Sequence, residues 1–333
     1  MDSRDCSVIV VSWNTRDLLD ACLSSVRARA PGAELIVVDN GSEDGSAARV
    51  RERFPEAVLI VNTSNRGFAR AVNQGIDRST RSVIVLLNPD ATLSEGAPDE
   101  LLRALDADPA IGIAGAQLLD ADGARQHSFD NVPTLASECL NKSLLRLLMP
   151  GRYPDKSRAL EGVTDVESVI GACIAIPRAA IEKVGSLDEA FFVFLEETDW
   201  CLRMRRAGLR VVHVPSARVV HLQGKSKATR PVLARIEYAR SLFLFFRKHR
   251  GVAAWLVLRA ARLLKSFLNL LVASLGTVLT LGLSASLRRR ARIHAGLFGW
   301  QILGCPATIG LQPPDLPPAR PLVSTPQLAG ARR

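Results

Sequence analysis

The sequence lacks the signatures of several common protein classes. Its six cysteines form no CxxC pair, so neither a paired-cysteine zinc site nor a disulfide framework is indicated, and we expect free thiols in a reducing compartment. The opening stretch MDSRDCSVIVV has no basic segment before its apolar run, which argues against a secretory signal. No zinc-finger spacing or RNP-like motif is present, and no GxGxxG follows the first predicted strand. These absences count against nucleic-acid binding and against a Rossmann dehydrogenase.

Aromatic residues are also few, at 5% of the 333 residues, whereas apolar residues make up 47%. This balance is typical of a globular α/β protein with ample core and excludes a disordered chain. Charge is distributed unevenly. From Lys225 onward there are eighteen Lys and Arg against two acids (net +16), whereas the preceding chain has 25 bases and 31 acids (net −6). A basic, apolar tail behind a slightly acidic body favours an anionic membrane surface as partner.

Short apolar runs alternate with helix-forming segments along most of the chain. The first predicted strands are 6–12, 34–39, 57–62, 83–87 and 111–118. Repeated β-α-β units with short connections predict an α/β fold with a mostly parallel, doubly wound sheet. Later expected elements are an irregular, substrate-facing excursion at 125–164, strands at 168–176, 210–214 and 217–221, and helices at 196–207 and 235–250.

The apolar run Val83–Leu87 is the expected central strand, and it ends abruptly at Asn88-Pro89-Asp90. Pro89 cannot donate to a sheet ladder, so the strand stops there. An amide and a carboxylate then lie at the carboxyl end of a central strand, where open α/β sheets bind ligands. Asp90 suits a divalent cation, because hard cations take oxygen ligands together with substrate phosphates. Taken alone, a polar turn closing an ordinary strand is the simpler interpretation.

Several segments together resemble a known family. The motifs VIVVSWNTRDLLDACLSSV, IVVDNGSEDGS, NRGFARAVNQGI and VLLNPDA occur in the order found in family 2 glycosyltransferases with the GT-A fold. The second half, from GACIAIPRAAIEKVG through EETDW to VVHLQGKS, is similar too. The resemblance runs from about residue 6 to 250 and is strongest to bacterial rhamnosyltransferase-like members that build surface polysaccharides or cell-wall linkers. It implies a nucleotide-diphospho-sugar transferase sheet.

The resemblance also implies roles for single residues. The nucleotide-sugar-binding candidates are Asp39, Asn65, Gly67, Asn73 and Asn88. The DxD metal motif of the family falls on Asn88-Pro89-Asp90, where an amide replaces the first carboxylate. Asp90 is then the principal carboxylate of a Mg²⁺ or Mn²⁺ site that His221 completes, with weaker metal affinity because Asn88 brings no charge. Without the resemblance, Asp39 would be a turn former and His221 a structural residue.

The acidic cluster at 196–199 corresponds to the ED-type motif of the family, which makes Glu197 the expected general base. Glu196 and Asp199 are the other catalytic candidates. A sugar hydroxyl that attacks an anomeric carbon must lose its proton, and the departing nucleoside diphosphate needs its charge stabilised. The usual second acid is aspartate, so glutamate adds a methylene. Alternatively, these acids merely favour a helix N-terminus. Along the same helix, the arginines Arg203, Arg205 and Arg206 are expected on a solvated face.

The basic tail contains one long uncharged segment, residues 266–287. As a single helix it would measure about 33 Å, enough to cross a hydrocarbon core. Because bases flank both ends and polar residues interrupt it, we expect helices lying on the membrane, with a single span as the alternative. The predicted organisation is a GT-A catalytic domain at 1–230, a helical membrane-associating region at 231–305 and a disordered tail at 306–333, located at the cytoplasmic face of the plasma (inner) membrane.

The resemblance implies an inverting, metal-dependent hexosyltransferase. The expected donor is a nucleotide-sugar, with dTDP-rhamnose as the first candidate, and the expected acceptor is a lipid-linked saccharide in cell-surface polysaccharide or cell-wall synthesis. A processive synthase is disfavoured, because the chain has no QxxRW motif and lacks several clear membrane spans. A catalytically inactive member acting as a membrane-bound assembly scaffold is the alternative, since Asn88 and Glu197 depart from the family pattern.

Overall fold

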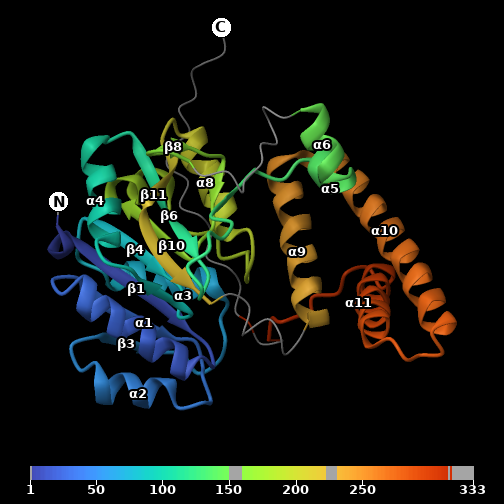
Figure 1. Ribbon diagram of the computed structural model, residues 1–333, viewed down its shortest axis with the longest axis horizontal. Coiled ribbons are helices and arrows are strands. Elements are labelled where there is room, and N and C mark those ends of the chain that lie inside the picture. The colour runs from blue at the N-terminus through green and yellow to red at the C-terminus, as the bar shows by residue number, and fades with distance from the viewer. Residues whose placement is uncertain (1, 150–159, 223–230, 314–315, 317–333) are drawn as a thin grey trace, which may run out of the picture.

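A computed structural model describes residues 2–149, 160–222, 231–313 and 316 (Figure 1). Its strands are β1 (Cys6–Ser12), β2 (Glu34–Asp39), β3 (Val58–Val61), β4 (Val83–Leu87), β5 (Ala91–Leu93), β6 (Ile111–Leu119), β7 (Phe129–Asp130), β8 (Thr164–Asp165), β9 (Ser168–Val169), β10 (Cys173–Pro177) and β11 (Arg210–His221). Its α-helices are α1 (Arg16–Arg29), α2 (Ser46–Arg53), α3 (Phe68–Arg78), α4 (Ala97–Ala107), α5 (Leu135–Cys139), α6 (Lys142–Leu148), α7 (Arg178–Val184), α8 (Glu196–Arg206), α9 (Pro231–His249), α10 (Gly251–Leu279) and α11 (Ala285–Ile302).

The main sheet has the strand order β3-β2-β1-β4-β10-β6-β11-β5, with β8 paired to β11. The pairs among β3, β2, β1 and β4 are parallel, as is the β6–β11 pair, whereas β10 lies antiparallel between β4 and β6. The predicted α/β, mostly parallel sheet is therefore confirmed. Strands β4 and β6 follow one another in the predicted order, but β10 lies between them. Because β10 is antiparallel to both, the sheet is mixed.

Both faces of the sheet are covered by helices, which explains why its central strands are continuous apolar runs. Alternate residues of each strand point to opposite faces. Val8, Val10 and Val85 pack with α1, α2 and α4 on one face. Ile9 and Ile84 pack with α3, α7 and α8 on the other. The result is a three-layer arrangement, visible on the left of Figure 1.

Two predicted strand boundaries are wrong. The predicted strand 168–176 is divided into β9 and β10, because its first half pairs with β7 and its second half with β4 and β6. The predicted strands 210–214 and 217–221 form the single strand β11, whose pairing with β6 shifts register between Val214 and Arg218. A β-bulge thus replaces the predicted break.

The C-terminal helices lie beside the α/β part (Figure 1). Helix α9 buries Phe243, Phe245 and Phe246 in a cluster that also contains Phe191 and Leu195 from the segment before α8. The excursion after β7 joins the two parts, since Glu138 on α5 pairs with Arg262 on α10. Residues 150–159 of the predicted excursion lie outside the described residues.

The uncharged segment 266–287 is not one helix. Helix α10 ends at Leu279, and the chain turns through Leu281 and Gly282, both at positive φ, before α11 begins. Among the described helices, none has a stretch long and apolar enough to cross a membrane. Residues 306–313, at the start of the predicted disordered tail, lie against α9, and most of the remaining tail lies outside the described residues. The predicted domain boundaries stay predictions.

A buried ionic cluster joins α8 to the end of α9. The Asp199 side chain is fully buried, and its Oδ1 lies 2.6 Å from both Lys248 Nζ and His249 Nε2. Its Oδ2 accepts a hydrogen bond from Arg203 Nε at 2.8 Å. Arg206 Nη1 lies 2.8 Å from His249 Nδ1, and because a guanidinium only donates, Nδ1 accepts and Nε2–H donates to Asp199. The expectation that Arg203 decorates a solvated face is therefore wrong.

Burial alone would raise the pKa of Asp199, but the hydrogen bond from His249 and the charges of Arg203 and Lys248 outweigh it and hold the pKa well below its usual range. We therefore expect Asp199→Asn to lower the free energy of unfolding by roughly 3 kcal/mol at neutral pH, because three donors lose their buried anion. Because the pKa of Asp199 is lower in the folded state than in the unfolded state, its ionised form stabilises the fold fully above about pH 4. This stabilisation is lost as the pH falls from there through the folded-state pKa. The deficit should accordingly shrink below pH 4 in urea titrations.

The exposed Asp122 provides the control for this prediction. Asp122→Asn should change the free energy of unfolding by less than about 0.5 kcal/mol at any pH. A deficit for Asp199→Asn that is equally large at pH 3 and pH 7 would show that Asp199 does not act through its charge.

Candidate active site

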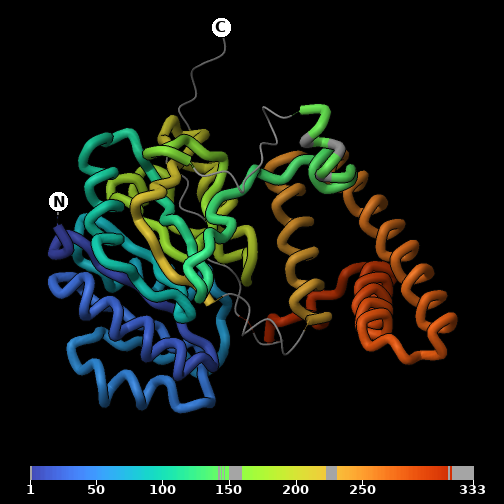
Figure 2. Tube along the Cα trace, in the orientation of Figure 1, coloured from blue at the N-terminus to red at the C-terminus, as the bar shows by residue number. Residues whose placement is uncertain are grey.

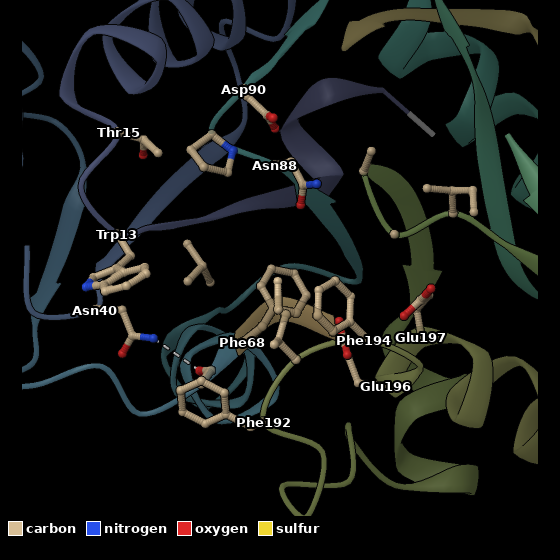
Figure 3. A pocket seen from close by; sticks show the side chains of 18 of the residues that line it. Trp13, Thr15, Asn40, Phe68, Asn88, Asp90, Phe192, Phe194, Glu196 and Glu197 are labelled. Atoms are coloured by element: carbon tan, nitrogen blue, oxygen red, sulfur yellow. Dashed lines mark hydrogen bonds between the residues drawn. The ribbon is translucent and has the colours of Figure 1, made fainter. Parts of the chain in front are cut away.

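The carboxyl ends of the parallel strands and the start of β10 meet at one edge of the sheet, and a pocket of about 510 Å³ opens there. Figure 3 shows Trp13 and Asn40 at one end, Glu196 and Glu197 at the other, and Asn88 and Asp90 along one side. Seven predicted site residues line it: Asn65, Gly67, Asn88, Asp90, Glu196, Glu197 and His221. The sheet therefore brings together most of the predicted site, and the roles of its single residues stay predictions.

Asp90 and His221 are neighbours despite their separation in sequence. Strand β5 follows Asp90 directly and pairs with β11 so that Ala91 lies opposite His221. Leu222 N–H donates to the Asp90 carbonyl at 2.9 Å, which closes this ladder. As a result His221 Nε2 lies 3.3 Å from Asp90 Oδ1, with both side chains largely buried. A carboxylate oxygen and an imidazole nitrogen thus face the same point of the pocket.

The charged side chains that line the pocket, among the described residues, are acidic. Three carboxylates line it, from Asp90, Glu196 and Glu197, and among the residues that the structure describes no Lys or Arg does. A diphosphate entering this pocket would meet carboxylates without a fixed cation to balance them. Ligands of this kind bind acidic pockets together with Mg²⁺ or Mn²⁺, held by one or two side chains and by phosphate oxygens. Among the described residues, no group of three or more His, Cys, Asp or Glu is arranged to hold a metal ion. The Asp90 carboxylate and the His221 imidazole are two donors of the kind that shared coordination uses.

A network of amides shapes the other end of the pocket. Asn40 Nδ2 donates to Asn65 Oδ1 at 2.9 Å and to the Gly67 carbonyl at 3.2 Å, within the part drawn in Figure 3. Asn40 Oδ1 accepts from Arg66 N–H, and Asn65 Oδ1 accepts from Gly67 N–H. The amide oxygen of Asn65 is therefore used in fixing the turn into α3. Asn65 contributes to the pocket chiefly by setting the path of this backbone.

Gly67 is required by a close backbone approach. Its φ is +87°, and a Cβ there would lie 2.7 Å from the carbonyl oxygen of Phe192. That same carbonyl accepts a hydrogen bond from Phe68 N–H at 2.6 Å. The segment before α8 is thus held against the start of α3, which positions the two ends of the pocket relative to one another.

Asp39 lies beside the pocket at the end of β2, and one of its oxygens has no protein partner. Its Oδ1 accepts from Ser42 N–H at 2.9 Å, whereas the buried Oδ2 has no hydrogen-bond partner among the described residues. A buried oxygen without a donor is energetically costly. A ligand N–H or O–H would satisfy it, which fits the predicted contact with a nucleoside.

Besides Asp39, two predicted site residues do not line the pocket. Asn73 exchanges hydrogen bonds with the Leu187 backbone and donates to Glu189, so its amide holds α3 to the segment before α8. Asp199 points away from the pocket into the ionic cluster with α9. Neither side chain is placed to touch a ligand in the pocket, and both position the elements around it. The helix α8 instead presents Glu196 and Glu197 from its first turn.

Several lining residues carry no chemical signal in the sequence. They are Phe68, Phe192 to Phe194, Ile170 to Ala172, His127, Ala234 and Leu311. Gly171 is the exception, because a glycine inside an apolar strand pattern marks a bend or a close approach. Here it separates β9 from β10, and a Cβ would lie 3.4 Å from Glu197 Cβ. That distance is ordinary van der Waals contact, so Gly171 borders the Glu197 side chain without a clash that would require glycine.

Comparison with known proteins agrees with this arrangement. The family model described as "Glycosyl transferase family 2" matches residues 7–185, more than half of the chain. The chain is 26% identical over 261 residues to the N-acetylglucosaminyl-diphospho-decaprenol L-rhamnosyltransferase of Mycobacterium tuberculosis, covering 73% of this chain and 85% of that protein. It is 25% identical over 229 residues to the dTDP-rhamnosyl transferase RfbF of Shigella flexneri, covering 67% and 71%.

The fold is also similar to that of a solved structure, the mannosyltransferase PcManGT from Pyrobaculum calidifontis in complex with GDP-Man and Mn²⁺. The TM-score is 0.53 at 19% sequence identity, with 90% of this chain and 86% of that chain covered. At this identity the likeness shows the fold, which is GT-A.

The close approach at Gly67 makes a prediction. Gly67→Ala should lower the free energy of unfolding by roughly 3 kcal/mol, because the added methyl collides with the Phe192 carbonyl at a backbone angle that L residues rarely adopt. Gly45→Ala is a matched control, since Gly45 has a φ of +84° with nothing within 4 Å of its would-be Cβ. It should cost only about 1 kcal/mol. Equal losses in urea unfolding would mean that the contact with Phe192 is unimportant.

Proposed function

This chain belongs to glycosyl transferase family 2 and is a glycosyltransferase of the GT-A fold, and we propose that it is inverting and metal-dependent. In this proposal it transfers one sugar from a nucleotide-sugar to an acceptor in cell-surface glycan synthesis. The observation that carries it is a single pocket that holds the Asp90–His221 pair on one side and two glutamates at one end.

The nucleotide would occupy the end of the pocket bounded by Trp13 and Asn40, with a nucleoside donor group satisfying Asp39 Oδ2. The diphosphate would then lie toward Asp90 and His221, the two residues that would hold a Mg²⁺ or Mn²⁺ ion. When bound, that ion would neutralise the charge that develops on the departing diphosphate. Asn88 lines the same wall and can add an amide oxygen without adding charge.

Glu197 is the proposed general base. It lies at the end of the pocket opposite Trp13, so a sugar bound between them would have its diphosphate on one side and a carboxylate on the other (Figure 3). The base would accept the proton of the acceptor hydroxyl as that oxygen bonds to the anomeric carbon and the diphosphate leaves. A single displacement of this kind inverts the anomeric configuration.

Rhamnose from dTDP-rhamnose is the proposed donor sugar, and a lipid-linked saccharide is the proposed acceptor. Two relatives whose names specify rhamnosyl transfer support the donor, and the name of the mycobacterial one includes a diphospho-decaprenol-linked sugar. The identities of about a quarter are low, so these names suggest the first substrates to test.

A lipid-linked acceptor agrees with the surface of the C-terminal helices, for which we propose peripheral binding at the cytoplasmic face of the plasma (inner) membrane. One face of α10 is apolar and at least half exposed over roughly 30 Å, at Val257, Leu264, Leu268, Leu271, Leu275 and Val278. The opposite face of α10 buries Leu258, Ser266 and Ala273. The exposed arginines Arg288, Arg289, Arg290 and Arg292 follow on α11 and suit anionic headgroups.

We expect Glu197→Gln and Asp90→Ala to fail in different ways. Glu197→Gln should reduce transfer at least about 100-fold while leaving Mn²⁺-dependent donor binding unchanged, because it removes only the proton acceptor. Asp90→Ala should abolish Mn²⁺-dependent donor binding itself. Calorimetry with dTDP-rhamnose and Mn²⁺ measures binding, and sugar transfer to an N-acetylglucosaminyl-diphospho-prenol measures activity.

The exposed Glu182 on α7 gives a neutral control, Glu182→Gln. Full transfer activity in Glu197→Gln would contradict its role as the base, and normal metal-dependent binding in Asp90→Ala would contradict the site. If the unchanged protein binds donors but transfers to none of a panel of acceptors, the inactive scaffold becomes the better interpretation.

The membrane proposal predicts the effect of charge on the apolar face of α10. The double substitution Leu271→Glu and Leu275→Glu should weaken binding to vesicles of mixed phosphatidylglycerol and phosphatidylcholine at least about tenfold, because two apolar side chains no longer enter the lipid. The control places the same two charges on the catalytic domain, with Ala48→Glu and Ala121→Glu, and should bind nearly as the unchanged protein does. If both double variants lost vesicle binding equally in flotation assays, attraction by the net charge of the protein alone would explain the binding.

A further inference from the structure

The chain returns to the pocket after its last helix. Figure 2 shows the segment after α11 running back past the start of α9 toward the α/β part. Leu311, in this segment, lines the same pocket as Asp90 and Glu197. The pocket is therefore built from residues as far apart in sequence as Val11 and Leu311, and its last wall comes from beyond the helical region.

Two side chains of α9 hold this returning segment in place. Glu237 is completely buried, and its carboxylate accepts from Arg240 Nη1 at 2.8 Å, Gln312 Nε2 at 3.0 Å and Leu311 N–H at 3.3 Å. Arg240 also donates to the carbonyls of Pro306 and Ile309. A Cβ at Gly310 would lie 2.8 Å from Glu237 Oε2, so the backbone passes directly over the ion pair. A buried acid whose oxygens receive three donors fixes the position of Leu311.

Leu311 reaches the pocket from the side of α9, where its N–H donates to Glu237. Ala234, one turn before Tyr238 on α9, also lines the pocket. The ring of Tyr238 packs edge-on against Phe194, at 5.9 Å between centroids, two residues before Glu196. This face of α9 thus borders the start of α8. Phe194 lies toward the glutamates and away from Trp13 and Asn40 (Figure 3). Ala234 and Leu311 line the same pocket from α9 and the returning segment, so the three residues form an apolar wall.

We propose that this wall is part of the acceptor subsite and that Leu311 is a specificity-determining residue that contacts the acceptor. The inference rests on the proposed function, because it takes the glutamate end of the pocket as the place where the acceptor hydroxyl is deprotonated. An apolar wall there fits an acceptor that presents carbon-bound hydrogens next to its reacting hydroxyl, as the face of a sugar ring does. Residues 306–312 of the same chain thus form part of the wall of that subsite.

The first test separates acceptor from donor binding. Leu311→Ala should raise the KM for an N-acetylglucosaminyl-diphospho-prenol about tenfold, since it removes apolar contact from one wall, and should leave the KM for dTDP-rhamnose within about twofold. Leu303→Ala, in the same connection but 67% exposed, is the matched control and should change neither. A parallel rise in both constants would indicate a distorted pocket, and no change in either would mean that the acceptor does not reach Leu311; each result overturns the proposal.

The second test detects contact without relying on kinetic constants. In the full chain carrying Leu311→Cys, alkylation at position 311 should slow at least about fivefold when the same prenol-linked acceptor is added at several times its Kd, and should be unaffected by dTDP alone. The exposed Cys139 serves as the internal reference in the same digest. Unchanged alkylation while sugar transfer proceeds would overturn the role of Leu311 and leave the proposed function intact. Absence of transfer to every acceptor tested would refute the proposed function, and this inference with it.

Discussion

The structure depends on one buried charge, that of Asp199. Its carboxylate binds Lys248 and His249 at the end of α9, and Lys248 also pairs with Asp188 in the segment before α8. That segment is held to α3 by Asn73 and through the Phe192 carbonyl. Removing one partner from a buried ionic cluster leaves the others uncompensated, which is far more costly than the net stabilisation the cluster provides. The geometry of both ends of the pocket is therefore tied to a group that touches no ligand.

The pocket itself is arranged at the expense of stability. Asp90, Glu196 and Glu197 converge at one edge of the sheet, where their charges repel, and Asp39 keeps a buried oxygen without a donor among the described residues. Natural proteins tolerate such costs mainly at sites where a ligand removes them. The surrounding elements supply the compensation: a sheet covered on both faces and an aromatic cluster between α9 and α8.

Sequence predicted the sheet well because its strands are buried on both faces and so appear as apolar runs; β2 and β4 have the predicted bounds. It also placed Asn88 and Asp90 at the carboxyl end of β4, because Pro89 stops the strand there, although only the resemblance favoured a binding site over an ordinary turn. It could not predict that β10 lies between β4 and β6, because pairing between distant segments leaves no local pattern. Nor could it tell Asp199 from Glu197. Both are acids of one short motif, and only the position of α9 decides which is satisfied by protein and which faces the pocket.

One consequence concerns the order in which the pocket comes into being during synthesis. Its lining begins at Val11 and includes Leu311. The three carboxylates that line it, from Asp90, Glu196 and Glu197, therefore leave the ribosome before the wall that α9 and the returning segment provide. Contacts of such long sequence range form late in folding, and the chain emerges from its N-terminus onward. Under the proposed function, a nascent chain would carry its donor site well before an enclosed acceptor site. Sugar transfer, and any wasteful loss of the donor to water, would then be timed by the last helices to fold.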